Sequence, residues 1–189
     1  MKFKNTSVVF IVLLICFSIL YFPTSIPTVK SDTAVPAWDF EDHTVNHNVL
    51  TTLSSSQIIN ELTTMNSIFQ AHGLPAPQHI AYPYGAYNSE VISVVSQYRL
   101  SGRTAGSGNF PETYPVSEWY SLSSVCLQAD TTFSQYKAWV DAAVSQKALL
   151  NLFTHRVSNP PDPYGCTPTM LGLVLDYLVA QQNAGNLTV

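Results

Sequence analysis

Charged side chains are scarce in this sequence of 189 residues. Lysine, arginine, aspartate and glutamate together make up 11% of it, and the formal net charge at pH 7 is -4. Proteins that bind nucleic acid present clustered lysine and arginine to the phosphates, so this composition argues against a nucleic-acid partner. Hydrophobic residues make up 46% and aromatic residues 12%, which is enough for the packed core of one globular domain.

Long apolar runs are also few, and the clearest one lies at the N-terminus. Lys2 and Lys4 precede an uncharged apolar run from Ser7 to Phe22, which falls just short of the roughly 17 to 25 residues that span a bilayer. A basic start followed by such a run is typical of a secretory signal peptide, although Val29-Lys30-Ser31 is an imperfect cleavage site. We expect residues 1–31 to be a signal peptide or an uncleaved membrane anchor. The protein would then be extracellular, or anchored facing outside.

Cysteine is rare, with three in the chain. Cys16 lies in the predicted export segment, which leaves Cys126 and Cys166. In an oxidising compartment these two could form a disulfide, but isolated cysteines also serve as small buried hydrophobic residues, and the sequence leaves both readings open.

Alternating strands and helices are predicted along the rest of the chain. Ser54, with Gln57 three positions later, predicts the start of a helix that Gly73 ends. The apolar periodicity predicts further helices over Ser89–Tyr98, Phe133–Val144 and Thr169–Gln181, and strands over Ala37–Phe40, His79–Tyr82, Leu100–Thr104, Tyr120–Leu127 and Ala148–Phe153. This alternation predicts an α/β fold with parallel strands, whose functional residues lie where the strands end.

Two histidines are the first residues that indicate chemistry. His43 and His47 stand four positions apart, just after Asp39, Glu41 and Asp42. Each imidazole can offer one neutral nitrogen to a metal ion such as zinc. Catalytic zinc usually has three protein ligands, so the pair needs a further carboxylate or imidazole, and an ordinary surface or capping role is the alternative.

Two later stretches follow the histidine pair in a recognisable order. They are Ala81-Tyr82-Pro83-Tyr84-Gly85 and the segment Leu149 to His155. Together with His43-Thr-Val-Asn-His47, they resemble the NodB-like polysaccharide deacetylases, carbohydrate esterase family 4. The resemblance extends from about Trp38 to about Val179.

The resemblance implies roles for four residues. By position, His43 and His47 match the family's histidine ligands of a divalent metal, usually zinc. Tyr84 matches a tyrosine whose backbone N–H holds the oxyanion, and His155 matches a histidine that acts as general acid. Hydrolysis of an N-acetyl group needs an activated water, an acid and oxyanion donors. The resemblance therefore implies metal-dependent deacetylation of a chitin-like or peptidoglycan-like glycan.

The sequence departs from the family in two places. Upstream of Trp38 it has no Thr-Phe-Asp-Asp-like motif, which supplies the base and the third metal ligand, and Ala81 stands where many members carry an arginine. Asp39, Glu41 or Asp42 could be recruited as the missing ligand, or could lie in a solvated loop or helix start. We therefore expect a deacetylase-like hydrolase whose activity is impaired. The alternatives are a non-catalytic carbohydrate-binding or assembly protein, and a truncated gene product.

The missing motif also bears on the expected fold. The family barrel has seven or eight strands, whereas about five are predicted here, so we expect residues 35–189 to form a partial NodB-type (β/α) barrel without the first strand-helix units. Such a sheet has open edges, which favour self-association. The expected partners are a glycan substrate and, through the N-terminal segment alone, a membrane.

Overall fold

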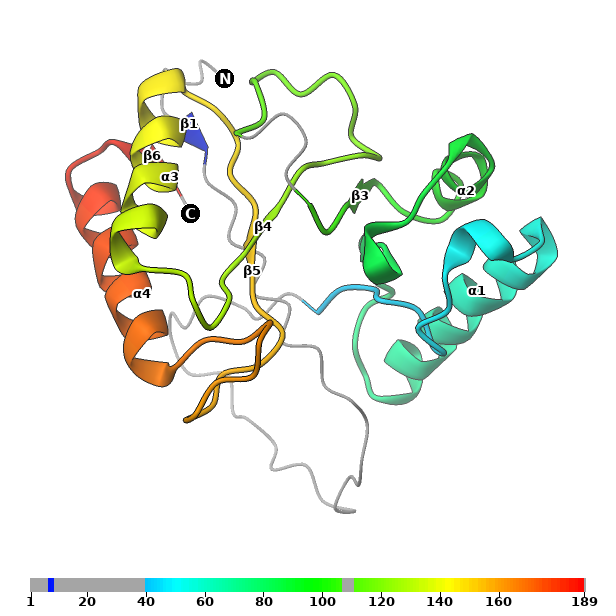
Figure 1. Ribbon diagram of the computed structural model, residues 1–189. Helices are drawn as coiled ribbons and strands as arrows, with labels where there is room; N and C mark the ends of the chain where they lie inside the picture. Colours follow the sequence, from blue (N-terminus) through cyan, green and yellow to red (C-terminus); the bar gives the residue numbers. More distant parts are fainter. Residues whose placement is uncertain (1–6, 9–39, 107–110, 189) are drawn as a thin grey trace.

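The computed structural model describes residues 7–8, 40–106 and 111–188 (Figure 1). The helices are α1 (Ser55–Ala71), α2 (Ser89–Val95), α3 (Phe133–Gln146) and α4 (Pro168–Asn183), with the short 3-10 helices η1 (Leu50–Thr52) and η2 (Pro83–Gly85). The strands are β1 (Ser7–Val8), β2 (His79–Ala81), β3 (Ser101–Arg103), β4 (Val125–Cys126), β5 (Leu152–Phe153) and β6 (Leu187–Thr188). Helices and strands alternate along the chain, which confirms the predicted α/β class.

The strands in the middle of the chain pair in parallel and in sequence order. Asp42 bridges to Ile80 in β2, β2 pairs with β3, Arg103 in β3 bridges to Leu122, and β4 pairs with β5. This succession of parallel neighbours is what a partial (β/α) barrel requires. Among the described residues the strands form three two-stranded pairs, and no closed barrel is present.

Local sequence signals account for where the helices begin. Ser54 and Gln57 form the predicted capping box at α1, and Asn88 caps α2 by accepting a hydrogen bond from Val91 N at 2.9 Å. Helix α2 ends at Val95 rather than at the predicted Tyr98. In the turn that follows, the chain winds more tightly than in an α-helix, because Gln97 N and Tyr98 N each donate a hydrogen bond to the carbonyl three residues earlier.

The buried side chains form two clusters on either side of the strands, as the two groups of helices in Figure 1 suggest. The first lies under α1 and α2 and includes Ile58, Leu62, Ile80, Tyr82 and Val95. The second lies under α3 and α4 and includes Tyr136, Val140, Leu150, Val174 and Leu178. The motif residues follow the strand ends along the chain, because the Pro-Tyr-Gly turn comes just after β2 and His155 comes just after β5.

Several sequence predictions need correction or stay untested. The predicted strands at 120–127 and 148–153 are shorter in the structure. The first is reduced to an isolated bridge at Leu122 and to β4, and the second to an isolated bridge at Leu149 and to β5. Each pairs with its neighbouring strands over only one or two residues. Of the predicted strand at 37–40, only Phe40 lies within the described residues, and it is not in a strand. Cys126 and Cys166 are free thiols. β1, which pairs in parallel with β6, lies within the predicted export segment, most of which is outside the described residues.

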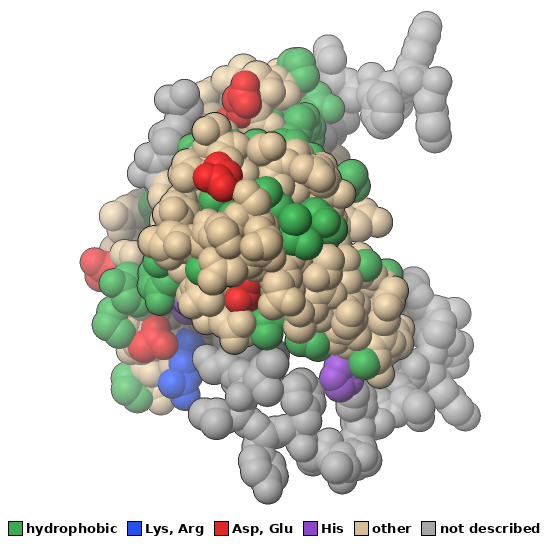
Figure 2. Space-filling view, turned by 90° about the vertical axis from the view of Figure 1, so that its right-hand side faces the viewer, with side chains coloured by type: hydrophobic (Ala, Val, Ile, Leu, Met, Phe, Trp, Pro, Cys, Tyr) green, Lys and Arg blue, Asp and Glu red, His purple; other side chains and the backbone are tan. Residues whose placement is uncertain are grey.

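The described surface is as poor in charge as the composition implies. On the face seen in Figure 2, tan and green atoms predominate and the acidic side chains are scattered, with a basic side chain beside an acidic one at the lower left. None of the described helices has the length and apolar character needed to cross a membrane.

Candidate metal-binding and catalytic site

The histidine pair lies on a tight loop that leaves the edge of β2. Asp42 N donates to His79 O at 3.1 Å, and Ala81 N donates to Asp42 O at 2.9 Å. Thr44 N then donates to Asp42 Oδ1 at 2.6 Å, and His47 N donates to Thr44 Oγ1 at 3.1 Å. Thr44 (φ 64) and His47 (φ 54) both have left-handed backbone, which costs about 1–2 kcal/mol for a non-glycine residue. These hydrogen bonds hold the loop in that conformation.

The loop brings the two imidazoles together. His43 Nε2 and His47 Nε2 are 3.0 Å apart, and His43 Nδ1 lies 2.7 Å from the carbonyl oxygen of Ala81. Since a carbonyl only accepts, His43 Nδ1 carries the proton and its Nε2 lone pair faces His47. Metal-binding histidines are commonly oriented in this way, with the second nitrogen donating to a carbonyl.

The surroundings of His43 keep its ring neutral. Burial lowers the pKa of His43 to about 4; the hydrogen bond to Ala81 opposes this shift, and the nearby His47, Arg103 and His155 add to it. At neutral pH the Nε2 lone pair is therefore available to a metal ion without loss of a proton.

A buried glutamate on α1 holds the same loop from the other side. Glu61 Oε2 accepts hydrogen bonds from Val45 N at 2.8 Å and Asn46 N at 3.0 Å, while Oε1 accepts from Asn46 Nδ2 at 2.7 Å and Asn48 Nδ2 at 3.3 Å. Burial raises the pKa of Glu61, but these four bonds outweigh it and the pKa is lowered. Glu61 therefore fixes the backbone between the two histidines.

The Pro-Tyr-Gly turn lies beside the histidine loop. Tyr84 has left-handed backbone (φ 58, ψ 8), and its exposed ring packs edge-on against His47 with ring centres 4.7 Å apart. The turn closes through Gly85 N to Tyr82 O and Ala86 N to Pro83 O, neither of which uses the Tyr84 N–H. Gly85 (φ 69) suits this turn, because a Cβ there would meet Ala105 N at 2.5 Å.

His155 follows β5 on the other side of the site. Its Nδ1 lies 3.3 Å from Tyr164 O and 3.9 Å from Cys126 Sγ, and its ring is exposed. Burial raises the pKa of the Cys126 thiol to about 11, so the thiol is protonated at neutral pH. The charge of His155 contributes to the lowered pKa of His43, so these two residues are close enough to interact although they are more than a hundred positions apart in the sequence.

The neighbouring carboxylates are already engaged. Asp42 is fully buried, and its Oδ2 accepts from Arg99 Nε at 3.0 Å and Arg99 Nη2 at 2.6 Å. Glu41 Oε2 accepts from Gln78 N at 2.7 Å and His79 N at 2.6 Å. Asp42 is therefore neither in a solvated loop nor available as the third metal ligand, and that prediction is wrong for it. For Glu41, which is partly exposed, recruitment as a metal ligand stays a prediction. Asp39, the other candidate, lies outside the described residues.

The donor set suits a metal only in part. The two imidazole nitrogens converge, but no group of three or more histidine, cysteine, aspartate or glutamate side chains within the described ranges could hold a metal ion. Two neutral nitrogens are fewer than the three protein ligands usual for catalytic zinc. Metal binding by His43 and His47 therefore stays a prediction, and the described residues offer no third ligand beside them.

Arg103 is a residue of this region that the sequence did not single out. It pairs with Ala81 across β2 and β3, is 8% exposed, and stacks its guanidinium 4.2 Å above the ring of Phe153. Its charge adds to the lowering of the pKa of His43 and partly opposes the rise in the pKa of Cys126 that burial causes. An arginine inside a predicted buried strand was the available signal, because such a charge is rarely buried without a reason.

A pocket of about 350 Å³ opens beside Cys126. Polar groups dominate its wall, and one aromatic ring is present: Ala105, Gly106, Ser124, Val125, Cys126, Gln128, Asp130, Thr131, Gln135 and Trp139. A ligand there would lie next to the β4 residue that contacts His155. The site thus offers a hydroxyl- and amide-lined space beside the predicted general acid.

Comparison with known protein families supports the resemblance over part of the chain. Residues 28–102 match the model of a family described as polysaccharide deacetylase. Among solved structures, the chain is similar to a family 4 carbohydrate esterase from Streptomyces lividans in complex with acetate, with 16% sequence identity and a TM-score of 0.41. That similarity covers 78% of this chain and 62% of the esterase chain, so this chain spans less than two thirds of it. A comparison with curated proteins gives no match.

Proposed function

From the match of residues 28–102 to the polysaccharide deacetylase family, we propose that this protein hydrolyses N-acetyl groups on a glycan. The proposed reaction uses a divalent metal, zinc by preference. The matched residues include the histidine pair and the Pro-Tyr-Gly turn, while His155 lies beyond them. The observation that carries the proposal is the 3.0 Å approach of His43 Nε2 and His47 Nε2, with His43 Nδ1 held by Ala81 O.

Each residue has a distinct task in this proposal. His43 and His47 hold the metal, which when bound acts as a Lewis acid and lowers the pKa of water. The Tyr84 N–H, unused by the turn, donates to the oxyanion of the tetrahedral intermediate. His155 gives a proton to the leaving amine from the opposite side of the site. The base is unassigned among the described residues, and for this reason we propose that activity is impaired.

Acetate release tests the proposal. Partly acetylated chitin oligomers incubated with the full chain should release acetate, and a chelator should stop the release until zinc is restored. His43→Ala should reduce the rate to background, whereas His72→Ala should not, because His72 is an exposed histidine at the end of α1. Acetate release that persists in His43→Ala, or in the presence of chelator, would refute the role of the histidine pair.

A second candidate is a glycan-binding protein without turnover. It is favoured by the incomplete donor set in the described residues and by Tyr84, whose side chain is 68% exposed and is free to stack on a sugar ring. Saturable binding of chitin oligomers without acetate release would support it. Unchanged binding by Tyr84→Ala would remove this ring from the binding surface.

We also propose that the protein is exported and acts outside the cell, as a secreted or anchored form. The support is the basic start and apolar run within residues 1–22. Fractionation of expressing cells, with and without replacement of the apolar run by polar residues, tests this location. Retention of both forms inside the cell would argue against it.

A further inference from the structure

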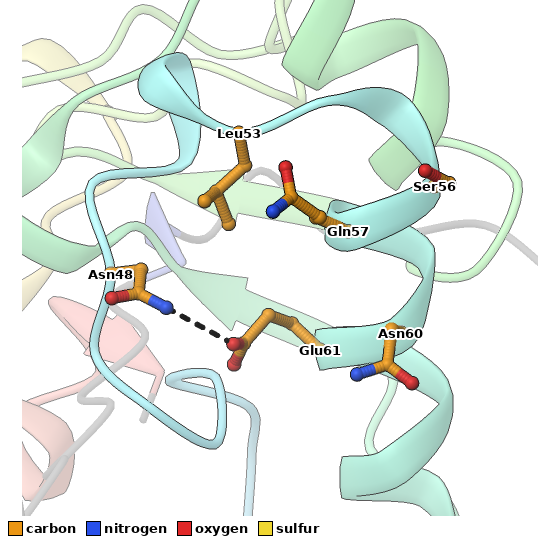
Figure 3. A pocket seen from close by; sticks show the side chains of 6 residues that line it. All are labelled: Asn48, Leu53, Ser56, Gln57, Asn60 and Glu61. Atoms are coloured by element: carbon orange, nitrogen blue, oxygen red, sulfur yellow. Dashed lines mark hydrogen bonds between the residues drawn. The ribbon is translucent and has the colours of Figure 1, made fainter.

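A second pocket lies beside the end of the histidine loop, at Asn48. It has a volume of about 290 Å³ and opens between residues 48–53 and the first two turns of α1 (Figure 3). Six residues line it: Asn48, Leu53, Ser56, Gln57, Asn60 and Glu61. We refer to it as the α1 pocket. Its volume is close to the lower end of the range for ligand sites, about 300 Å³.

The wall of the α1 pocket is rich in hydrogen-bonding groups, and all of its side chains except Glu61 are neutral. Asn48, Gln57 and Asn60 supply three carboxamides, each with one acceptor oxygen and two donor hydrogens. A sugar hydroxyl both donates and accepts, so carboxamides can satisfy it in either direction. Leu53 adds an apolar surface against which the C–H face of a sugar ring can pack. The pocket is lined by no lysine or arginine, so an anionic ligand would lack a counter-charge.

Glu61 is the one charged group in the wall, and its oxygens are occupied. Both oxygens already accept hydrogen bonds from the loop at Val45, Asn46 and Asn48. A cation in the pocket would have to displace those bonds, and the pocket brings no second carboxylate to help hold it. The chemistry therefore favours a neutral polar ligand over an ion.

The α1 pocket is continuous with the histidine loop. Asn48 follows His47 directly, and its amide donates to Glu61 Oε1 across the mouth of the pocket (Figure 3). Gln57 Oε1 accepts from Ser54 N at 2.9 Å, which leaves its amide N–H groups as the part that can meet a ligand. A ring held here would lie against the residue that follows the second histidine.

We propose that the α1 pocket binds a neutral, hydroxyl-rich sugar unit of a glycan chain, at a position separate from the pocket beside Cys126. The choice of a glycan as ligand rests on the proposed function. The binding itself requires neither the metal nor acetate release. The pocket would hold a second unit of the chain and so favour oligomers over single sugars.

Titration with tri-N-acetylchitotriose tests this directly. The full chain, labelled with nitrogen-15 and kept in a chelator, would be followed through the side-chain amide signals of Asn48, Gln57 and Asn60. We expect saturable shifts of these signals. Asn60→Ala should weaken binding by about two- to tenfold, the effect of one lost neutral hydrogen bond. Asn60→Trp, which fills the opening, should abolish the shifts at Asn48.

Asn183→Ala is the matched control, because Asn183 is an exposed asparagine at the end of α4. It should bind as the unaltered protein does. The proposal is overturned if the sugar shifts only signals around His155, if it shifts none, or if Asn60→Ala binds as tightly as Asn183→Ala. In a separate titration without chelator, saturable shifts of the same amides by calcium chloride, together with no shifts by the sugar, would identify a cation site instead. Since the titration excludes metal, loss of acetate release in the earlier assay does not affect its outcome.

Discussion

Replacing Arg99 with methionine should destabilise the protein far more than a single side-chain contact suggests. Arg99 pairs with Asp42 at 2.6 Å, both side chains are 0% exposed, and Arg99 Nη2 also donates to Leu62 O at 3.2 Å. Methionine fills much of the same space but carries no charge. Asp42 would remain buried beside the histidine loop without its counter-ion.

The expected loss is about 3–5 kcal/mol, the usual cost of removing one partner of a buried ion pair. Domains of this size have total stabilities of about 5–15 kcal/mol, so the variant should be only marginally folded. The double variant Asp42→Asn, Arg99→Met should recover part of the loss, because an asparagine carries no charge and can still accept the hydrogen bond from Thr44 N. Urea unfolding followed by circular dichroism measures both.

The surface pair Lys137–Asp141 provides the control. Its N–O distance is 2.5 Å, but the two side chains are 47% and 46% exposed, so solvent screens the attraction. Lys137→Met should leave the unfolding midpoint within experimental error. If Arg99→Met also left the midpoint unchanged, or if the double variant were less stable than Arg99→Met, the reasoning about the buried pair would be refuted.

Three further predictions concern the strands, pH and the histidine loop. Gly102→Ala should lower the free energy of unfolding by about 1–3 kcal/mol, because the new Cβ would clash with the buried hydroxyl of Tyr82, whereas Gly172→Ala in α4 should raise it by about 0.5–1 kcal/mol. Thermal melts that rank the two variants in the opposite order would contradict this. The metal-free protein should lose up to about 3 kcal/mol of folding stability between pH 6.5 and 4, because the pKa of His43 is lowered in the folded state and the unfolded chain binds the proton first. In acid titrations, a His43→Gln variant should lack this part of the pH dependence. Glu61→Gln should weaken zinc binding in calorimetry, with Glu90→Gln as an exposed control, because the new amide N–H groups would face the donors of Asn46 and Asn48.

The elements that sequence predicted well are those set by nearby residues. The capping box at Ser54 and the cap at Asn88 each act over three positions, so the starts of α1 and α2 were readable from the sequence. The positions of the strands were predicted, but their lengths were overestimated, because the length of a strand depends on the strands with which it pairs. The turn at Tyr84 and the histidine loop were located for the same local reason, as short motifs with a definite spacing.

The burial of the acidic residues could not be predicted in this way. Asp42 was expected in solvent or on a metal, but its partner Arg99 is 57 positions away. Glu61 offered a signal, because it lies between Ile58 and Leu62 on a helix, directly beside two positions of the apolar stripe. A carboxylate there is costly unless donors surround it, and the donors come from a loop 13 to 16 positions earlier.

These contacts give the acidic residues around the histidine pair a structural role. Of the twelve acidic residues, Glu41 binds the start of β2, Asp42 binds Arg99, and Glu61 binds the histidine loop. Each uses one or both carboxylate oxygens in hydrogen bonds around the loop whose two imidazole Nε2 atoms lie 3.0 Å apart, so binding a metal through those oxygens would cost the carboxylate these bonds. For the proposed metal site we therefore expect the third ligand to come from residues outside the described ranges, where Asp32 and Asp39 lie, or from solvent or substrate. Zinc affinity would then respond to Asp32→Ala or Asp39→Ala as a ligand loss, and to Glu61→Gln only as a loss of orientation.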